Sequence, residues 1–412
     1  MINGAPSTSR RIALVTSGFD LGGGVPAIAH WLRDCLQRTA EYTVDVHDLA
    51  TSSRDNDSRR LMAPRSWTLP TLRNQSDGED YVTKWGANAV ELEVMRYRPR
   101  KELTRVLRNY DIVQVVSGSP ALAWAAKDAG VPIVIWMASM VEWERRQRLA
   151  EQAGPLRLWQ QAMTALTSRV EHHALCNAGA VLALNSTLAK YLSGGGYRRV
   201  VTAFPGVDTV AFCPSNVGWR RDGHILSVCR LNDPRKGLER VLRAYAHIIE
   251  ADSSSPGLVL AGWGELPDAM VRLVRRLKLE PRVTVSPNVN PASLPELYRG
   301  ASVFLQASYE EGLGLSVLEA MACGVPVVTT ESAGTQETVI DRVTGRLVPQ
   351  AAGEEVARSI ADKVIDILRG DGSAMGARAR ERCQTKFSSD VAIKRFTDTY
   401  NDVVRPRVLE AV

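Results

Sequence analysis

The stretch from Ser302 to Thr329 reads Ser-Val-Phe-Leu-Gln-Ala-Ser-Tyr-Glu-Glu-Gly-Leu-Gly-Leu-Ser-Val-Leu-Glu-Ala-Met-Ala-Cys-Gly-Val-Pro-Val-Val-Thr. It begins with an apolar run at 302–306, continues through a polar, glycine-containing loop into a helical pattern, and ends in a second apolar run at 325–329. A strand, a helix and a second strand in this order form the repeating unit of a parallel sheet. The stretch therefore predicts an α/β fold.

The loop and the helix of this stretch carry two carboxylates, Glu311 and Glu319, separated by seven residues. Gly312 and Gly314 allow a ligand to approach the backbone closely, and the exposed amides of a helix start attract phosphate. A capped helix with a solvated glutamate is the ordinary alternative. The two carboxylates together with the glycines favour a ligand that carries both hydroxyls and phosphate.

The same alternation of apolar runs and helical patterns extends along nearly the whole chain. At 412 residues the chain is longer than a single core usually supports. We therefore predict two Rossmann-like domains, at 1–205 and 215–388, that face a central cleft. Strands are expected near 12–16, 43–48, 111–116, 132–136, 180–184 and 200–204 in the first domain, and near 224–229, 257–261, 282–285, 302–306 and 325–329 in the second.

For two parts of the chain the sequence allows more than one structure. Residues 51–80 are polar and rich in Ser, Asp, Asn and Arg, which predicts a mobile loop or an insertion on the first domain. Helices are expected at 354–368 and 389–404. The closing segment, about 389–412, has two alternatives: it packs on the second domain or returns to the first.

The composition narrows the class of protein. Hydrophobic content of 45% and charged content of 23% are ordinary for a soluble globular protein, and no apolar run is long enough to span a bilayer. The N-terminal residues do not resemble a signal peptide. Because the six cysteines lack Cys-x-x-Cys spacing, we expect a cytoplasmic protein with reduced thiols and no zinc site.

The charge differs between the two halves of the chain. Residues 1–205 contain 25 Lys and Arg against 19 Asp and Glu, a net +6, whereas residues 206–412 contain 26 of each. A basic first half suits anionic lipid or an acidic substrate, and ordinary scatter explains it equally well. Peripheral contact with the inner membrane surface, through a helix at Trp143–Arg148 with Arg157 and Trp159, therefore stays an alternative to a solvated helix face. No nucleic-acid recognition module is recognised, so nucleic acid is not an expected partner.

Three glycines, Gly22, Gly23 and Gly24, follow the first predicted strand and precede a helix that Pro26 opens. Such a loop suits a phosphate or a sugar. A dinucleotide site is the competing interpretation, but the spacing does not match G-x-G-x-x-G.

Arg230 and Lys236 flank a Pro-containing turn at the end of the first strand of the second half. Two cations in this place suit a pyrophosphate, with Arg as a forked donor and Lys as a point charge; a basic surface turn is the alternative. In a parallel sheet this turn is expected beside Glu311. Gly262, at the end of the next strand, indicates a close approach of the donor to the backbone or merely a turn, and Val289, after the strand that follows, is expected to line a base pocket through its backbone.

Two other polar groups have simpler explanations. Asp55-Asn56-Asp57 has the spacing of a metal–diphosphate site, but its Ser- and Arg-rich surroundings favour a solvated loop. His172-His173 lies in a helical segment without a carboxylate at metal spacing, which indicates a structural pair.

These motifs, in this order, resemble the retaining glycosyltransferases of family four, which have the GT-B fold. The resemblance is strongest from about residue 202 to 349 and looser before it. Its E-x7-E pattern is specific for the family and does not identify a substrate. The matching positions are Gly206–Asp208, Arg230, Lys236-Gly237, Gly262, Gly264, Ser308–Gly314, Glu319-Ala320, Gly324–Pro326 and Gly334-Thr335.

The resemblance implies a donor-binding second domain and an acceptor-binding first domain. Arg230 and Lys236 would bind the diphosphate and stabilise the charge of the leaving group in place of a metal ion. Glu311 would contact the donor sugar, and Glu319 would hold the ribose. The remaining implied donor-binding positions are the amides of Gly312, Leu313, Gly314 and Leu315, and the loop Gly22, Gly23 and Gly24 from the opposite domain.

The family often has a histidine after the strand at 130–137, where this chain has Ala138-Ser139. The expected function is a metal-independent, retaining glycosyltransferase without a cofactor. It would take a nucleotide-diphosphate sugar and a glycan, glycolipid or small-molecule acceptor. A catalytically silent nucleotide-sugar-binding partner subunit, favoured by Ala138, and a dinucleotide-dependent oxidoreductase, which rests on the glycine loop, are the alternatives.

Overall fold

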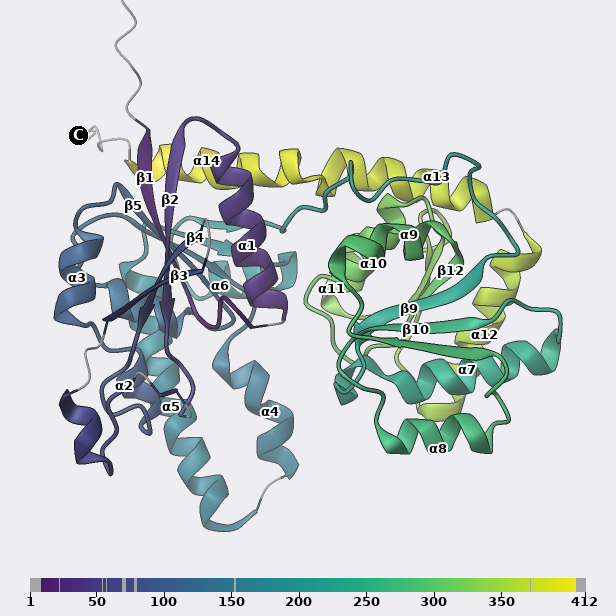
Figure 1. Cartoon of the computed structure of the whole chain (residues 1–412), viewed down its shortest axis with the longest axis horizontal. Coiled ribbons are helices and arrows are strands. Elements are labelled where there is room, and N and C mark those ends of the chain that lie inside the picture. Colours follow the sequence, from purple (N-terminus) through teal and green to yellow (C-terminus); the bar gives the residue numbers. More distant parts are fainter. Residues whose placement is uncertain are drawn as a thin grey trace, which may run out of the picture. The chain divides into compact units, whose positions relative to one another are not determined.

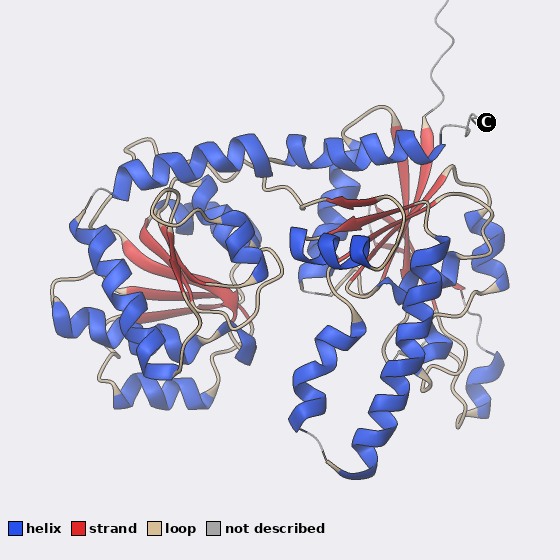
Figure 2. Ribbon diagram, turned by 180° about the vertical axis from the view of Figure 1, so that it is seen from behind, coloured by secondary structure: helices blue, strands red, loops and turns tan. Residues whose placement is uncertain are grey.

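The computed structural model describes residues 9–404 except 22, 54, 57, 69–71, 78–79, 152 and 371. It divides into two compact units: Met1–Pro205 together with Ile393–Val412, and Gly206–Ala392. Each unit is built on one sheet with helices on both of its faces (Figures 1 and 2). The predicted α/β class is confirmed. Within these described residues, no helix combines the length and the apolar character that a membrane span needs.

The first unit contains an eight-stranded sheet in the order β3-β4-β2-β1-β5-β6-β7-β8. Strand β3 pairs antiparallel with β4, and the other pairs are parallel. The strands are β1 (Arg10–Thr16), β2 (Tyr42–Leu49), β3 (Leu72–Asp77), β4 (Asp80–Trp85), β5 (Ile112–Ser117), β6 (Ile133–Met137), β7 (Ala180–Ala183) and β8 (Val200–Thr202). The helices are α1 (Gly24–Gln37), η1 (Pro64–Thr68), α2 (Glu93–Arg96), α3 (Lys101–Leu107), η2 (Pro120–Ala126), α4 (Val141–Glu151), α5 (Gly154–Asn177) and α6 (Ser186–Gly194).

Of the two predictions for residues 51–80, a mobile loop or an insertion, the loop is wrong in part. Strands β3 and β4 form an antiparallel hairpin that extends the sheet beyond β2, and η1 precedes it. Strands at the border of a sheet are not covered on both sides and tolerate polar residues, so they lack the apolar run that marks a central strand. The polar composition therefore concealed this hairpin.

The closing helix α14 (Ser389–Val404) belongs to the first unit from Ile393 onward. The buried Tyr400 donates a hydrogen bond of 2.9 Å from its hydroxyl to Oε1 of Gln114, a buried polar residue in the middle of β5. Trp31 of α1 packs edge-on against Phe396. A buried amide needs a partner, and the helix supplies one to the central strand.

The second unit contains a parallel six-stranded sheet in the order β11-β10-β9-β12-β13-β14. Its strands are β9 (His224–Arg230), β10 (Leu258–Trp263), β11 (Val283–Pro287), β12 (Ala301–Gln306), β13 (Val327–Thr330) and β14 (Arg346–Val348). Its helices are η3 (Pro234–Lys236), α7 (Leu238–Ala251), α8 (Asp268–Arg276), η4 (Pro291–Ser293), α9 (Leu294–Arg299), α10 (Leu315–Ala322), α11 (Ala333–Thr338), α12 (Gly353–Arg369), α13 (Gly372–Arg382) and η5 (Cys383–Phe387).

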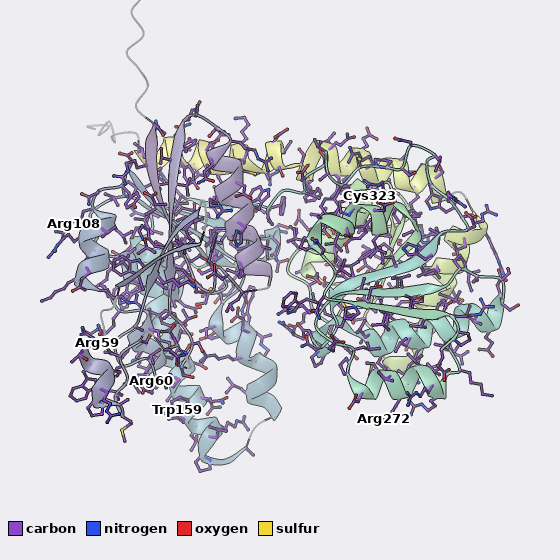
Figure 3. The ribbon with its side chains drawn as sticks, in the orientation of Figure 1. Arg59, Arg60, Arg108, Trp159, Arg272 and Cys323 are labelled. Carbon is purple, nitrogen blue, oxygen red and sulfur yellow. The ribbon has the colours of Figure 1, made fainter. Side chains whose placement is uncertain are left out.

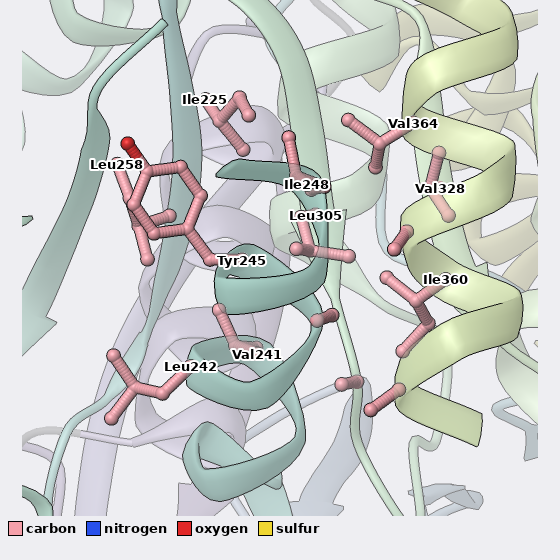
Figure 4. Close-up of a cluster of buried hydrophobic side chains, with 14 of the residues drawn as sticks. Ile225, Val241, Leu242, Tyr245, Ile248, Leu258, Leu305, Val328, Ile360 and Val364 are labelled. Carbon is pink, nitrogen blue, oxygen red and sulfur yellow. The ribbon is translucent and has the colours of Figure 1, made fainter. Parts of the chain in front are cut away.

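One face of this second sheet is covered by α7 and α12 (Figure 4). Val241, Tyr245 and Ile248 recur along one side of α7 at the spacing of an amphipathic helix, and all three are buried. Ile360 and Val364 of α12 join them. This packing anchors the helix that begins immediately after the turn carrying Lys236.

Candidate functional site

The strand order of the second sheet creates a switch point between β9 and β12. The chain proceeds from β9 to β10 and β11 on one side, and then returns to β12 on the other side of β9. The segments that follow these two strands consequently lead away in opposite directions. In open α/β sheets a crevice forms at such a point, outside the carboxyl ends of the strands, and ligands bind there.

Lys236 and Glu311 meet at this switch point. Lys236 ends the turn η3 after β9, and Glu311 lies in the loop after β12. Their Nζ and Oε2 atoms are 2.8 Å apart, and both side chains are largely buried, with 17% and 14% of their surface exposed. Oε2 of Glu311 also accepts hydrogen bonds from Nε2 of Gln306 and Oγ of Ser308. The side chain of Lys236 is therefore held in a fixed position.

Arg230 lies at the end of β9 and is more exposed than Lys236. Its Nη2 atom is 3.1 Å from Oδ2 of Asp233, and 43% of its side chain is exposed. Asp233 also pairs with the neighbouring Arg235 at 2.8 Å. The turn thus presents two arginines around one carboxylate, with Lys236 beside them on Glu311, and such a group of cations attracts a polyanion.

Gly237 explains how the turn after β9 can lie so close to the loop after β12. It adopts a left-handed conformation with φ of 63°, and a Cβ atom there would lie 2.1 Å from the carbonyl oxygen of Ala307. The amide of Tyr309 donates to the carbonyl of Arg235 at 2.8 Å, and the guanidinium of Arg240 stacks on the Tyr309 ring. Only glycine permits this approach without strain, and these contacts fix the two loops together.

The backbone from Gly312 to Leu315 forms the start of helix α10. Gly314 caps this helix with φ of 84°. Gly334, at the start of α11, packs directly on this backbone: a Cβ on it would lie 2.4 Å from the amide nitrogen of Leu313. The amide of Gly334 also donates to the carbonyl of Glu311 at 3.0 Å. The Gly334-Thr335 motif therefore packs against the backbone from Gly312 to Leu315 and stabilises its conformation.

Glu319 projects from α10 and has a partner that the sequence did not indicate. The hydroxyl of Tyr298, a fully buried residue of α9, donates a hydrogen bond of 2.6 Å to Oε2 of Glu319. Burial raises the pKa of Glu319 to about 7, although the bond from Tyr298 opposes this rise. An aromatic residue in a short amphipathic helix usually indicates core packing, so nothing marked Tyr298 as a functional position.

The raised pKa of Glu319 predicts a pH dependence of stability. The ordinary pKa of 4.5 applies in the unfolded chain, so the folded state binds the proton more tightly. The carboxyl stabilises the fold below about pH 4.5, and this contribution is lost as the pH rises through about 7. Substituting Glu319→Gln removes the dependence. We expect the unfolding free energy of the variant, relative to the parent, to increase on the order of 2 kcal/mol from about pH 5 to about pH 8.

Urea unfolding at a series of pH values measures this difference. Glu171 and Asp48, whose pKa values burial raises to about 7 and about 6, are present in both proteins, so their effects cancel. The matched control is Glu310→Gln, which removes an exposed carboxylate from the same loop region. Parallel pH profiles for Glu319→Gln and the parent would contradict the assigned pKa.

Gly262 and Val289 lie at the carboxyl ends of the strands on the other side of β9. Gly262 has φ of 136°, and a Cβ there would lie 1.8 Å from the carbonyl oxygen of Cys229. The amide of Val289 donates to the carbonyl of Gly262 at 3.3 Å. The close packing of β10 on β9 is thus a sufficient reason for glycine at 262.

The glycine loop of the first unit follows β1. Gly22 lies outside the described residues. Gly23 has φ of 148° and caps α1, which begins at Gly24. Asp48, at the end of the neighbouring strand β2, is bonded to backbone groups of Gly18 and Phe19. The carboxyl ends of β1 and β2 therefore lie together beneath this loop.

Ala138 and Ser139, at the place where the resemblance predicted a histidine, follow β6 in the first unit. Their amides donate to the carbonyl of Gly118, at 3.1 and 2.8 Å. Beneath them the buried Glu171 accepts hydrogen bonds at Oε1 from Oγ of Ser119 and the amide of Val141. Burial raises the pKa of this carboxyl to about 7. Glu171 thus links the loops after β5 and β6, which the sequence did not reveal.

The remaining candidates behave as structural groups. Asp55 accepts a hydrogen bond from Ser58, and Asp57 lies outside the described residues. His172 pairs with the Tyr197 hydroxyl at 2.8 Å. All six cysteines are free thiols. Across the described ranges, no group of three or more His, Cys, Asp or Glu side chains is placed to hold a metal ion.

The family model described as "Glycosyl transferases group 1" matches residues 219–382, which contain Arg230, Lys236, Glu311 and Glu319. This match places residues 219–382 in the glycosyltransferase group 1 family. The family resemblance predicted from the motifs is confirmed. The match covers the sheet and both loops of the switch point, whereas the whole of the first unit lies outside it.

Curated proteins similar to this chain include two named D-inositol 3-phosphate glycosyltransferase. The relative from Salinispora tropica is 28% identical over 334 residues, 74% of this chain and 66% of the relative. The one from Kribbella flavida is 35% identical over 211 residues, 47% of this chain and 49% of the relative. The matched part of the chain spans about half to two thirds of the length of these relatives.

Solved structures of glycosyltransferases share the fold of the whole chain. Sucrose-phosphate synthase from Thermosynechococcus elongatus matches with a TM-score of 0.69 at 22% identity, over 96% of this chain and 99% of that one. HepE from Anabaena, solved in complex with UDP-glucose, matches with a TM-score of 0.67 at 16% identity, over 95% and 100% of the two chains. At these identities the likeness shows the fold, and the predicted GT-B class is confirmed.

Proposed function

We propose that this protein is a metal-independent, retaining glycosyltransferase that transfers a sugar from a nucleotide-diphosphate sugar to a hydroxyl acceptor. The observation that carries the proposal is the meeting of Lys236 and Glu311 at the switch point, at 2.8 Å, with Arg230 on the same turn. A cation pair next to a carboxylate suits a diphosphate joined to a polyhydroxylated sugar.

In the proposed reaction the acceptor oxygen forms a bond to the anomeric carbon on the same face from which the diphosphate departs. The bond between the anomeric carbon and the phosphate oxygen breaks, and the departing phosphate takes the proton of the acceptor hydroxyl. Arg230 and Lys236 stabilise the negative charge that develops on the diphosphate. Glu311 positions the sugar hydroxyls, and Glu319 accepts hydrogen bonds from the ribose.

The similar proteins support the substrate classes. The curated relatives are named for a phosphorylated cyclitol acceptor, and HepE was solved with UDP-glucose. We propose that the first unit binds the acceptor, which is a glycan, a glycolipid or a small-molecule precursor. We also propose that the reaction takes place in the cytoplasm.

A panel of UDP-, GDP-, ADP- and TDP-sugars tests the function. We expect one of them to raise the melting temperature and to release free nucleotide slowly even without an acceptor, with the same rate in excess EDTA. A chain that binds a nucleotide sugar without ever releasing nucleotide would instead be the silent partner subunit, an alternative motivated by Ala138. A thermal shift with NAD(P) alone would favour the oxidoreductase.

Helix α5 suggests peripheral membrane contact. Its first turns expose Leu156, Leu158 and Trp159, with 57%, 68% and 52% of their surface accessible. Trp159 is labelled in Figure 3. Arg157 is exposed beside them. Apolar and basic side chains on one exposed helix favour an anionic lipid surface. We propose that this part of α5 contacts the inner membrane surface.

Vesicle sedimentation checks this proposal. Substituting Trp159→Ser should weaken partitioning onto phosphatidylglycerol vesicles about tenfold, because the lost apolar area corresponds to roughly 1.5 kcal/mol. The matched control is Trp263→Ser, which removes an exposed tryptophan from the second unit. Equal partitioning of both variants and the parent would rule out α5 as the contact.

A further inference from the structure

A pocket in the first unit gathers positive charge away from any residue assigned above. Its cavity volume is 340 Å³, at the lower end of the range for small-ligand sites. Four cations line it, Arg59, Arg98, Arg100 and Lys101, against one carboxylate, Glu102. We call this the basic pocket.

Arg100 is the unusual member of the basic pocket. Only 3% of its surface is exposed. Its Nε atom donates to the carbonyl of Gly86 at 2.7 Å, and Nη2 donates to the carbonyl of Arg96 at 3.1 Å. The buried Nη1 atom has no hydrogen-bond partner within the described ranges. Burial lowers the pKa of this guanidinium to about 10, partly offset by Asp55. A buried donor without a hydrogen-bond partner is costly, so the unpartnered Nη1 of Arg100 points to a ligand.

The basic pocket lies where the parallel strands β2 and β4 end. Strand β4 runs parallel to β2 and finishes at Trp85, and the following Gly86 accepts from Arg100. Arg59 is tied to the same segment, because its amide donates to the carbonyl of Ala87 at 2.8 Å and its carbonyl accepts from the amide of Val90. The carboxyl ends of strands are where α/β sheets bind ligands. The backbone of the pocket is therefore fixed before a ligand arrives.

We propose that the basic pocket binds a small ligand that carries a phosphate group. The Nη1 group of Arg100 is the donor that remains for a phosphate oxygen, because Nε and Nη2 already donate to backbone carbonyls. Arg98 and Lys101 are exposed at the pocket and add positive charge that attracts a phosphate dianion. The site belongs to the first unit and uses none of the residues proposed to bind the donor.

The test uses the full chain with the background substitution Lys236→Ala, because the proposed donor site also attracts phosphate. Calorimetry with inorganic pyrophosphate at constant ionic strength should detect one binding event. The double substitution Arg98→Ala with Lys101→Ala should weaken it at least about tenfold, the effect of losing charge-assisted hydrogen bonds. Both side chains are exposed, so folding is not expected to suffer, unlike with a change at the buried Arg100.

The matched control is Arg108→Ala at the other end of α3, which removes an exposed arginine that does not line the pocket (Figure 3). It should retain the affinity of the background protein. Phenylglyoxal labelling read by mass spectrometry adds a site-resolved measure: pyrophosphate should protect Arg98 and leave Arg108 reactive. Equal affinity of the double variant and the background protein, or an equal loss with Arg108→Ala, would overturn the proposal.

A phosphate group can belong to a soluble ligand or to a lipid headgroup, and a second arm distinguishes the two. In the Trp159→Ser background, which weakens the contact proposed for α5, a further loss of phosphatidylglycerol vesicle binding on replacing Arg98 and Lys101 would identify a headgroup as the source. If pyrophosphate binds but vesicle binding does not depend on Arg98 and Lys101, the ligand is a soluble one. Absence of both would overturn the assignment, and it would leave the donor-binding proposal untouched because Lys236 is already replaced.

Discussion

Replacing Lys236 with alanine is expected to lower kcat/KM for the nucleotide-sugar donor by about 10³-fold, mostly through kcat. The ammonium group lies 2.8 Å from Glu311 and is largely buried, so its charge acts where water screens little. Negative charge grows on the diphosphate as the bond to the sugar breaks. A group that stabilises this charge lowers the barrier more than it tightens ground-state binding.

Steady-state kinetics on the parent and two neighbouring variants measures this effect. Lys236→Arg keeps the charge and should recover part of the rate. Arg235→Ala is the matched control, since it removes a cation from the same turn whose side chain is 55% exposed and already paired with Asp233. A loss of the same size in Arg235→Ala would mean that the turn acts only through its overall charge.

Substituting Gly237→Ala is expected to destabilise the second unit by about 3 kcal/mol and to abolish most donor binding. The left-handed backbone at φ of 63° alone costs a non-glycine residue roughly 1–2 kcal/mol. The added Cβ would lie 2.1 Å from the carbonyl oxygen of Ala307, and relieving such a clash costs typically 1–3 kcal/mol. Relief requires that the turn carrying Lys236 move away from the loop carrying Glu311.

Gly218→Ala separates the two contributions. Gly218 has φ of 74°, and a Cβ there would meet no atom within 4 Å. Its substitution should therefore cost only the backbone part, about 1 kcal/mol, and leave donor affinity unchanged. Denaturant unfolding and calorimetric donor titration of both variants give the comparison. Equal losses in the two variants would show that contact with Ala307 does not hold the site together.

The central strands could be predicted because they are buried on both faces. β12, for example, has six consecutive buried residues, so its apolar run stands out without any periodicity. Three other strands were not predicted. β3 and β4 lie in a polar part of the chain, and the three-residue β14 has no apolar run that stands out. The border strands β8 and β11 contain apolar residues and were predicted.

One feature of the candidate site could be predicted from the sequence, and others could not. The proximity of Lys236 and Glu311, 75 positions apart, followed from placing both after neighbouring parallel strands. The direct ion pair between them, the bond from Tyr298 to Glu319 and the unpartnered Nη1 of Arg100 depend on side-chain packing between separate elements. A linear pattern does not encode such contacts, because each partner alone has an ordinary local sequence.

Hydrogen exchange of the full chain with a bound nucleoside diphosphate tests the central claim most directly. The ligand is the one of UDP, GDP, ADP and TDP that gives the largest thermal shift. We predict that its binding slows amide exchange in two segments of the second unit, 230–237 and 307–319, and that Lys236→Ala greatly reduces this protection. Unchanged exchange in both segments at saturating ligand would contradict a diphosphate-sugar site at the β9–β12 switch point.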